Sequence, residues 1–582
     1  MDPVDPARPV RATLDDRPDA GLARPASEGE RAARSGAAAG TADDWWRTGV
    51  IYQIYPRSFA DSDGDGVGDL AGIIARLDHL ASGPEGLGVD AIWLSPIYPS
   101  PGLDVGYDVS DYVGIDPRYG TLADFDRLVD ESHRRGIKVI LDLVLNHTSQ
   151  AHPWFVESRA SRTGPKADWY LWRDPAGRTR SGRPIRPNNW RSWFGGPAWT
   201  WDETRQQFYL HTFLPEQPDV NWRQPAVRLA MLEVVRTWLE RGVDGFRFDV
   251  FNAFFKHPDL PSNPRRLGGR QSYWWQRHIY DKDQPELIGA LDEIRARVDE
   301  RPGRMTVGEP FESPVELAAR YFAPGHLVFD FGLIETPWSA RRFARAIARR
   351  EAAFGPDRWP TVVLSNHDRS RHASRFDDGR HGEARAKVAA VLLLTLRGTP
   401  FLYYGEEIAL RDVAIPRAEI VDPPALRSTF FSPWWNRDQA RAPMPWGGGP
   451  KGGFSTARPW MRMAADPDRR NVAAQSAEPG SVLELYRRLL RLRRSSPALR
   501  GGTYTEVDIG RQDVLAYLRQ TPDQTALVIL GFGDRPAPLH LPTPPTDRRW
   551  GVVLSTHEPP PAPTADGRLD LRPLEALILF AV

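Results

Sequence analysis

The sequence contains no cysteine among its 582 residues. This absence excludes disulfide bonds, thiol catalysis and zinc or iron sites with cysteine ligands. The chain also has no run of about 18 apolar residues, so we expect no membrane-spanning segment. Its first residues lack the apolar stretch of a signal peptide, and we therefore predict a cytoplasmic protein.

An excess of one charge is missing as well. The 76 lysines and arginines balance the 75 aspartates and glutamates, which leaves a formal net charge of +1. No basic block is interleaved with aromatic residues, so neither nucleic acid nor a membrane is an expected partner. Proline and tryptophan, by contrast, are abundant, with 54 and 21 residues. This composition predicts long, shaped loops and a surface that stacks on flat ligands.

Aromatic residues are absent from residues 1–44, which are rich in Ala, Pro, Gly, Arg and Asp. A segment of this composition cannot bury enough apolar surface to offset the entropy of ordering it. We predict that residues 1–44 form a disordered N-terminal extension, with a tail docked on the folded part as the alternative.

From residue 45 onward, short apolar segments alternate with amphipathic helical patterns, which is typical of βαβ units. Several segments are almost continuously apolar, as expected for parallel strands that are covered on both faces. Eight candidate strands occur, at residues 50–55, 91–96, 138–146, 245–249, 306–309, 327–331, 361–368 and 401–404. Eight parallel strands most simply close into a (β/α)₈ or TIM barrel, so we predict an α/β protein of this class.

Two regions interrupt the alternation. Residues 148–222 are rich in Trp, Pro, Gly and Asn and show no helical period, which predicts an inserted loop-rich domain after the third strand. After about residue 501, apolar runs are separated by turn residues, which predicts a C-terminal antiparallel β-sandwich at 501–582. The barrel is then formed by residues 45–147 and 223–500.

Reactive side chains gather at the ends of the predicted strands. In a barrel of this type, the carboxyl ends of the strands form the active-site face. Those ends carry three carboxylates, two histidines and one arginine, namely Asp249, Glu309, Asp368, His147, His367 and Arg247. Converging carboxylates in a chain without cysteine favour acid–base or glycosyl chemistry.

Glycoside hydrolysis needs two carboxyl groups in different protonation states. Arg247 and Asp249 are two residues apart on a strand, so we expect the guanidinium to lower the pKa of Asp249 and keep it ionised. Glu309 lies between a glycine and a proline and has no basic neighbour in the sequence. We therefore expect its pKa to be raised, as a general acid requires.

These segments resemble the α-amylase superfamily of glycoside hydrolases, in particular its α-glucosidase and oligo-1,6-glucosidase branch. The matching motifs are DVGYD at 104–108, DLVLNH at 142–147, GFRFD at 245–249, GE at 308–309 and SNHD at 365–368. Further matches are QPDVNW at 217–222, YGEEI at 404–408, and RD at 437–438 followed by PMPW at 443–446. The motifs occur in family order, from about residue 45 to the C-terminus.

The resemblance implies a role for each of the three carboxylates. Asp249 resembles the nucleophile that forms a covalent β-glucosyl intermediate, and Glu309 resembles the general acid and base. Asp368 resembles the residue that holds the 2- and 3-hydroxyls of the sugar. Together these roles imply a retaining mechanism.

The resemblance also implies a set of substrate-binding residues: Asp104, Tyr107, His147, Arg247, His367 and Arg437. Asp104 would bind distal hydroxyls of the terminal glucose, and Tyr107 would stack on its ring. Arg437 would close the pocket, with Arg441 as the alternative for this role. A closed pocket implies exo-action on one terminal glucose.

The function that follows is an exo-acting α-glucosidase that takes terminal α-linked glucose from short oligosaccharides. An α-glucosyl transferase or a trehalose-synthase-type isomerase remains the alternative, because water and a sugar compete for the same intermediate. A non-catalytic relative is disfavoured, since the carboxylates are present. Val250 goes with α-1,6 preference in one branch, but residues 251–256 depart from it, so both α-1,4 and α-1,6 activity are expected. The oligomeric state stays open.

An acidic loop after the first strand has the ligand spacing of a calcium loop. Oxygen ligands fall at positions one, three, five, seven and nine: Asp61, Asp63, Asp65, the carbonyl of Val67, and Asp69. Position twelve is Gly72 where a bidentate glutamate is usual. The branch that the chain resembles also carries a metal here, so we expect structural Ca²⁺, or Mg²⁺, and no organic cofactor. A solvated turn without metal is the competing interpretation.

Overall fold

The structure, a computed structural model, describes residues 44–267, 273–321, 327–427, 436–544 and 548–582. The segment that we predicted to be disordered, 1–44, lies outside these residues except for Asp44. The described residues all belong to one compact unit. Among them, no helix combines the length and the apolar character needed to cross a bilayer.

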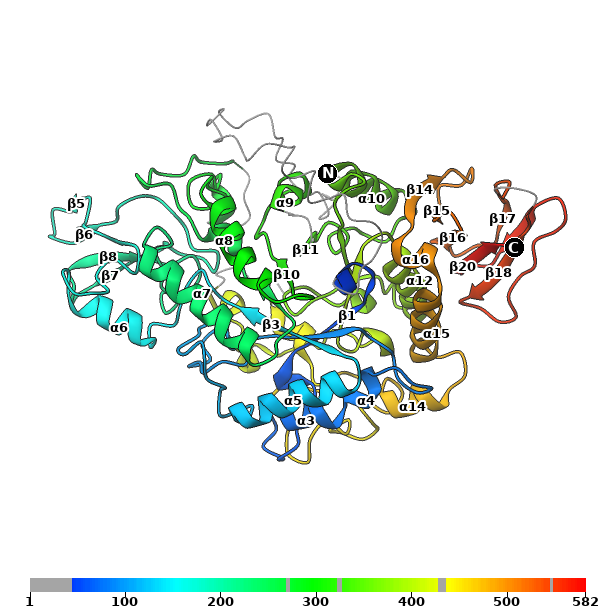
Figure 1. Cartoon of the computed structure of the whole chain (residues 1–582), viewed down its shortest axis with the longest axis horizontal. Coiled ribbons are helices and arrows are strands. Elements are labelled where there is room, and N and C mark those ends of the chain that lie inside the picture. Colours follow the sequence, from blue (N-terminus) through cyan, green and yellow to red (C-terminus); the bar gives the residue numbers. More distant parts are fainter. Residues whose placement is uncertain (1–43, 268–272, 322–326, 428–435, 545–547) are drawn as a thin grey trace. The chain divides into compact units, whose positions relative to one another are not determined.

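Eight parallel strands form the central sheet, in the order β11-β10-β9-β3-β2-β1-β13-β12. Figure 1 labels β1, β3, β10 and β11 of this sheet. They are β1 (Ile51–Ile54), β2 (Ala91–Leu94), β3 (Lys138–Leu143), β9 (Gly245–Phe248), β10 (Met305–Gly308), β11 (Leu327–Val328), β12 (Thr361–Val363) and β13 (Thr399–Tyr403). Each overlaps one of the eight predicted strands, and the sheet curves into a nearly closed barrel. The predicted TIM-barrel class is confirmed.

The barrel closes at β11 and β12 through a side chain. The hydroxyl of Thr361 donates to the Val328 carbonyl at 3.2 Å and accepts from the Asp330 N–H at the same distance. Thr361 is fully buried, so these bonds satisfy backbone groups that would otherwise lack a strand partner. The hydrogen bonds of the Thr361 side chain thus connect β11 and β12, which form no backbone ladder with each other in the described residues.

Alternating side chains of the strands fill two different cores. Inside the barrel, Ile51, Trp93 and Val307 belong to one buried cluster. On the outside, Tyr52 and Val139 belong to a second cluster that includes the helices. The covering helices are α3 (Leu70–Ala75), α4 (Leu77–Leu80), α5 (Leu122–Arg134), α7 (Pro225–Glu240), α8 (Leu287–Asp299), α9 (Val315–Tyr321), α10 (Ala340–Phe354), α11 (His372–Arg375), α12 (Gly382–Thr395) and α15 (Val482–Ser495). Short helices complete the chain at α2 (Trp45–Thr48), α13 (Pro423–Arg427), α14 (Val472–Ala477) and α16 (Pro497–Gly501).

The segment inserted after β3 has more regular structure than its sequence predicts. It holds one helix, α6 (Pro153–Ala160), and a three-stranded antiparallel sheet of β4 (Trp172–Arg173), β8 (Gln207–Leu210) and β7 (Trp199–Asp202). A two-stranded ribbon of β5 (Gly177–Arg178) and β6 (Pro184–Ile185) extends from it. Trp190 and Trp199 are almost fully buried in a small core that Leu260, from outside the insertion, also joins.

The C-terminal segment is a β-sandwich, as predicted. Five antiparallel strands form one sheet: β14 (Thr503–Val507), β15 (Val514–Gln520), β16 (Thr525–Gly531), β20 (Ala576–Ala581) and β18 (Trp550–Ser555). The pair β17 (Ala537–His540) and β19 (Arg568–Leu571) forms the other sheet. Apolar side chains of both sheets, among them Leu527 and Leu539, share one buried cluster. Phe532 joins the sandwich to the barrel side by packing on Trp338, with ring centroids 4.5 Å apart.

Candidate active site

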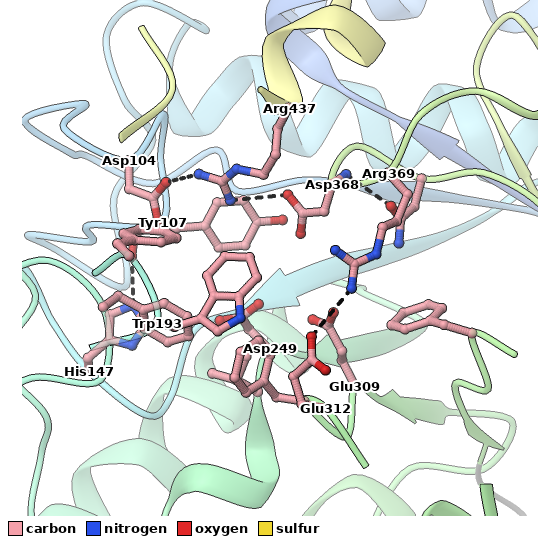
Figure 2. Close-up of a pocket in the computed structure, with 16 residues that line it drawn as sticks. Asp104, Tyr107, His147, Trp193, Asp249, Glu309, Glu312, Asp368, Arg369 and Arg437 are labelled. Carbon is pink, nitrogen blue, oxygen red and sulfur yellow. Dashed lines mark hydrogen bonds and ion pairs between the residues drawn. The ribbon is translucent and has the colours of Figure 1, made fainter. Parts of the chain in front are cut away.

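A pocket of about 610 Å³, including its opening to solvent, lies at the carboxyl ends of the barrel strands. Seven of the nine predicted catalytic and substrate-binding residues line it: Asp104, Tyr107, His147, Asp249, Glu309, Asp368 and Arg437 (Figure 2). The other two, Arg247 and His367, are 1% exposed and do not line the pocket. Arg247 contacts the lining residue Asp249, and His367 contacts the lining residue Asp368. Residues far apart in the sequence therefore meet at one place.

Sheet-like backbone hydrogen bonds continue one residue past the strands and position Asp249 and Glu309. Asp249 follows β9, and its N–H donates to the Leu143 carbonyl at 3.0 Å. Glu309 follows β10, and its N–H donates to the Phe248 carbonyl at 2.9 Å. Each carboxylate thus stands one residue past the end of its strand, at the same height on neighbouring strands.

Arg247 links the two carboxylates through one guanidinium. Its Nη1 donates to Asp249 Oδ1 at 2.6 Å and to Asp142 Oδ1 at 2.8 Å. Its Nη2 donates to Glu309 Oε2. Asp142 is the direct neighbour of Arg247 in the β3–β9 register, which explains their contact. One buried cation therefore serves three buried carboxylates.

The predicted depression of the Asp249 pKa is not what the structure gives. Burial raises the pKa of Asp249 to about 7, although the charge of Arg247 acts to lower it. Burial raises the pKa of Glu309 to about 8, again against Arg247. The expectation failed because one guanidinium is shared by three carboxylates that are all withdrawn from water. For Glu309, the raised pKa that the sequence led us to expect agrees in direction with the structure.

Asp368 is held ionised on the opposite side of the pocket. Burial acts to raise its pKa, but His367, Arg437 and Arg441 together hold it well below its usual range. Because burial lowers the pKa of His367 to about 3, this imidazole is neutral near pH 7 and the arginines carry the effect. Arg437 Nη1 and Arg441 Nη2 lie 3.2 Å and 3.0 Å from Asp368 Oδ1. Both arginines considered for this position contact the carboxylate.

Arg437 also spans the pocket to Asp104. Its Nη2 lies 2.7 Å from Asp104 Oδ1, and its Nε lies 2.7 Å from Asp422 Oδ1. Asp104 receives a further bond, of 3.1 Å, from the Gln217 amide. The sequence places Arg437 more than three hundred residues after Asp104, yet both side chains line the pocket and contact each other.

Two neutral rings complete this end of the pocket. Tyr107 lies parallel to His367, with centroids 5.4 Å apart, and its hydroxyl oxygen is 2.6 Å from His367 Nε2. The same hydroxyl donates to Asp142 Oδ2 at 3.0 Å. Burial lowers the pKa of His147 to about 4, so its imidazole is a neutral hydrogen-bonding group near pH 7. These contacts place Tyr107 and His147 at the lining without adding charge.

The inserted segment supplies an aromatic wall. Trp193, Phe194 and Phe213 line the pocket together with Phe311 and Val250, and all five share one buried cluster. The abundance of tryptophan predicted a surface that stacks on flat ligands, but not which tryptophan would reach the pocket. The structure assigns Trp193 to the lining.

A buried lysine ties the insertion to the chain behind the pocket. Lys256 Nζ lies 2.8 Å from Asp219 Oδ2 and donates to Asn146 Oδ1 at 3.0 Å. Lys256 is 1% exposed and Asp219 is fully buried. Asp219 also accepts two bonds from Thr212, at 2.9 Å and 2.6 Å. Sequence analysis missed Lys256, because its partners lie in two distant motifs.

Glu312 and Arg369 also line the pocket and were not among the predicted site residues. Arg369 directly follows Asp368, so its nearness to the SNHD motif was a signal that could have pointed to it. Glu312 follows a glutamate–proline pair in a loop, where the sequence offers no comparable signal.

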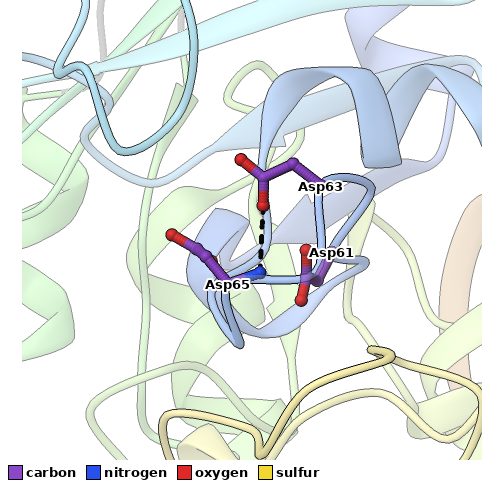
Figure 3. A group of neighbouring side chains, drawn as sticks. All are labelled: Asp61, Asp63 and Asp65. Atoms are coloured by element: carbon purple, nitrogen blue, oxygen red, sulfur yellow. Dashed lines mark hydrogen bonds between the residues drawn. The ribbon is translucent and has the colours of Figure 1, made fainter.

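The acidic loop before α3 brings three of its five predicted ligands together (Figure 3). Carboxylate oxygens of Asp61, Asp63 and Asp65 lie within 4.8 Å of one another. Asp69 stands outside this group and caps α3, accepting from the Gly72 N–H at 2.6 Å. Val67 donates its N–H to Asp65 Oδ1 at 2.7 Å, which shapes the loop around the group.

Known proteins match this fold and these motifs. Residues 53–502 match the family described as alpha amylase, catalytic domain. A probable alpha-glucosidase of Rhizobium meliloti is 45% identical over 514 residues, which cover 86% of this chain and 91% of the relative. An oligo-1,6-glucosidase of Parageobacillus thermoglucosidasius is 36% identical over 569 residues, which cover 92% of this chain and 98% of the relative.

Solved structures are similar along nearly the whole chain. An alpha-glucosyl transfer enzyme has a TM-score of 0.84 and 40% identity, with 92% of this chain and 99% of that chain covered. The trehalulose synthase of Pseudomonas mesoacidophila MX-45 has a TM-score of 0.81 and 34% identity, with 92% and 99% covered. The chain therefore belongs to the α-amylase family of glycoside hydrolases, as its motifs predicted.

Proposed function

We propose that the protein is a retaining, exo-acting α-glucosidase that releases terminal α-linked glucose from short oligosaccharides. One observation carries the proposal: Arg247 contacts both Asp249 and Glu309, which line one pocket together with Asp104 and Arg437. A retaining glycosidase needs its two carboxyl groups about 5–5.5 Å apart. Two carboxyl groups bound to the same guanidinium support a spacing of this order.

The first step would use Asp249 and Glu309 in different states. Ionised Asp249 attacks the anomeric carbon, the glycosidic C–O bond breaks, and Glu309 gives its proton to the leaving oxygen. Burial raises the pKa of Glu309, which supports its role as the group that carries the proton. Asp368, held ionised by its arginines, would bind two hydroxyls of the same glucose.

The second step would release glucose with its configuration retained. Glu309, now ionised, takes a proton from water, the water oxygen attacks the anomeric carbon, and the bond to Asp249 breaks. The ring of Tyr107 and the neutral His147 would hold the sugar in place during both steps. The Arg437–Asp104 ion pair supports exo-action, because two lining side chains that bind each other would restrict this end of the pocket to a terminal glucose.

We also propose that both α-1,4 and α-1,6 linkages are cleaved. Val250 lines the pocket next to Asp249 in a left-handed conformation, with φ of 36°. Because Val250 packs with Phe311 and Phe213, its side chain is fixed in position. Relatives named alpha-glucosidase and oligo-1,6-glucosidase match the chain, which supports an activity that covers both linkages.

The second candidate is transfer of the glucosyl group to a sugar, or its isomerisation. Similarity to an alpha-glucosyl transfer enzyme and to a trehalulose synthase favours it. Both reactions would use the same intermediate on Asp249, and they differ in what attacks it. Hydrolysis follows when water occupies the place of the leaving sugar, and transfer follows when a second sugar occupies it.

Separating the products formed from maltose, isomaltose, sucrose, trehalose and starch tests the proposal. We expect glucose from maltose and isomaltose and little reaction with starch. Asp249→Asn and Glu309→Gln should each lower kcat for maltose by about 10³-fold. Asp534→Asn, which changes an exposed aspartate of the sandwich, should not. Accumulation of trehalose, trehalulose or longer sugars in place of glucose would favour the second candidate.

We further propose that the acidic loop holds a structural Ca²⁺, with Mg²⁺ as the alternative. Oxygen donors suit a hard cation, and Asp61, Asp63 and Asp65 bring three carboxylates together. Gly66, the sixth residue of the loop, has φ of 95°, as the sharp turn of a calcium loop requires. The Val67 carbonyl would add a ligand, and Asp69 would add another only by giving up a bond that now caps α3. A bound cation would neutralise like charges and fix the loop that precedes α3.

A further inference from the structure

One charged pair in the pocket is used by no step of the proposed reaction. Glu312 and Arg369 both line the pocket, and Arg369 Nη2 lies 3.5 Å from Glu312 Oε1. Their side chains are 21% and 32% exposed, so both are reachable from the opening. Figure 2 shows them beside Glu309, across Asp249 from Asp104 and His147.

The backbone of Glu312 is fixed in an unusual conformation. Its φ of 48° is left-handed, which a non-glycine residue keeps only where its surroundings hold it. Lys282 Nζ donates to the carbonyls of Phe311 and Glu312, at 2.8 Å and 2.7 Å. The Asn252 amide accepts from the Phe311 N–H at 2.8 Å and donates to its carbonyl at 2.9 Å. Hydrogen bonds from the buried side chains of Lys282 and Asn252 therefore fix the backbone around Glu312.

Arg369 retains hydrogen-bonding capacity. In the described ranges, Glu312 is the one partner that an ion pair or hydrogen bond gives to its guanidinium. At 3.5 Å this contact is longer than a well-formed hydrogen bond. The guanidinium carries five N–H donors, so most of them are available to a ligand. Its backbone adjoins Asp368, which two arginines anchor.

We propose that Arg369 and Glu312 bind the hydroxyl groups of the sugar unit on the leaving-group side of the pocket. The inference rests on the proposed function, in which Glu309 protonates the leaving oxygen. The leaving sugar must then lie on the side of Glu309, where this pair stands. Arg369 donates to hydroxyl oxygens and Glu312 accepts from hydroxyl protons, a combination that fits neighbouring hydroxyls of one sugar ring.

The same pair would bind a sugar that accepts the glucosyl group. Transfer to a sugar is the reverse of the first step, so the acceptor occupies the place of the leaving sugar. A hydroxyl oxygen of the acceptor attacks the anomeric carbon and becomes the new glycosidic oxygen, its proton goes to Glu309, and the bond to Asp249 breaks. Weakening the pair should therefore lower transfer relative to hydrolysis, because water does not need it.

Comparing two substrates isolates this role. Maltose has a leaving sugar with hydroxyl groups, whereas the leaving group of p-nitrophenyl α-glucoside is a ring without them. For Arg369→Met we expect the ratio of kcat/KM for maltose to kcat/KM for the aryl glucoside to fall about tenfold or more. Glu312→Gln should lower the ratio by a smaller factor, and Arg369→Lys should retain part of it.

The ion pair between Arg349 and Glu316, outside the pocket, provides matched controls. Arg349→Met and Glu316→Gln break a pair of the same kind, and the ratio should change less than about twofold. The fraction of longer sugars formed at high maltose concentration should fall in Arg369→Met and stay constant in the controls.

The outcomes separate this inference from the proposed function. If Arg369→Met and Arg369→Lys slow both substrates by the same factor and leave the transfer fraction unchanged, the pair is not a sugar-binding site. If the unmodified protein releases glucose from neither substrate, the proposed function itself fails, and the inference with it. A fall in the ratio together with a fall in transfer supports both.

Discussion

Arg247 determines how charge is distributed among the reactive groups. Its guanidinium contacts Asp142, Asp249 and Glu309, so one positive charge faces three carboxylates that also repel one another. Burial then dominates, and the pKa values of Asp249 and Glu309 both rise. Asp249 and Glu309 therefore hold a proton between them near neutral pH. This suits a pair in which one group must be ionised and the other protonated.

This distribution predicts a bell-shaped pH dependence. Asp249 must be ionised, so kcat/KM should fall as pH falls through about 7. Glu309 must be protonated, so kcat/KM should also fall as pH rises through about 8. Because both pKa values are raised, we expect the optimum of maltose hydrolysis near neutral pH, well above the range in which ordinary carboxylates titrate. An optimum below about pH 5, where ordinary carboxylates titrate, would contradict the shared guanidinium.

The site residues differ in how far the sequence could predict them. Asp249, Glu309 and Asp368 lie in short motifs at strand ends, and the barrel brings strand ends together. The pKa of Asp249 was predicted with the wrong direction, because burial and the sharing of Arg247 depend on the whole fold. The pairing of Arg369 with Glu312 was also out of reach, since no local pattern connects them.

Among the elements, the inserted segment depends most on tertiary contacts. Its strands have only two to four residues, too short for an alternating pattern to be recognised in the sequence. Helix α5 is the opposite case, because Thr121 and Asp124 form a reciprocal capping box that the residues themselves dictate. Elements that local chemistry specifies could be predicted, and those that packing specifies could not.

Lys256 should be essential to the attachment of the insertion. Lys256→Met leaves the fully buried Asp219 without its cation, which should cost about 3–5 kcal/mol of unfolding free energy. Lys166→Met removes a partly exposed pair with Glu157 in the same segment and should cost about 1 kcal/mol or less. Thermal unfolding of both variants measures the difference. Equal melting temperatures would show that the buried pair is dispensable.

The acidic loop gives a second prediction for a single element. The pKa of Asp63 is raised: a backbone bond from Asp65 acts to lower it, but burial and the charges of Asp65, Asp69 and Asp61 outweigh that bond. A cation would relieve this repulsion. At 100 times its Kd, Ca²⁺ should add about 2.7 kcal/mol to the free energy of unfolding, and EDTA should remove it.

Differential scanning calorimetry with EDTA, Ca²⁺ and Mg²⁺ checks the metal. Asp63→Asn should abolish the response to Ca²⁺. Asp78→Asn, which changes an exposed aspartate whose side chain pairs with Arg135, should preserve it. A melting temperature that is the same with EDTA and with either cation would support the solvated turn in place of the metal site.

At the scale of the whole molecule, the C-terminal sandwich supports the barrel without reaching the pocket. Phe532 is 7% exposed and packs on Trp338 and Phe343 next to α10, at 4.5 Å and 5.5 Å between ring centroids. Tyr517 contacts the Thr395 hydroxyl at the end of α12. The sandwich therefore covers apolar helix surface that would otherwise face water.

Phe532→Ala should lower stability and leave catalysis intact. Loss of this buried ring is expected to cost about 3–5 kcal/mol. Since no residue of the sandwich lines the described pocket, kcat and KM for maltose below the melting transition should stay within about twofold of the unmodified protein. Calorimetry and initial rates measure the two effects separately. A large change in KM would mean that the sandwich influences the substrate site.

The central claim is that Asp249 and Glu309 act on one anomeric carbon, with Asp249 forming the covalent bond. A fluorinated glucosyl fluoride tests it, because its good leaving group permits the first step while the ring fluorine slows the second. After inactivation and proteolysis, mass spectrometry should find one glucosyl adduct, on Asp249. An adduct on Glu309 or on another residue, or continued turnover without any adduct, would contradict the account.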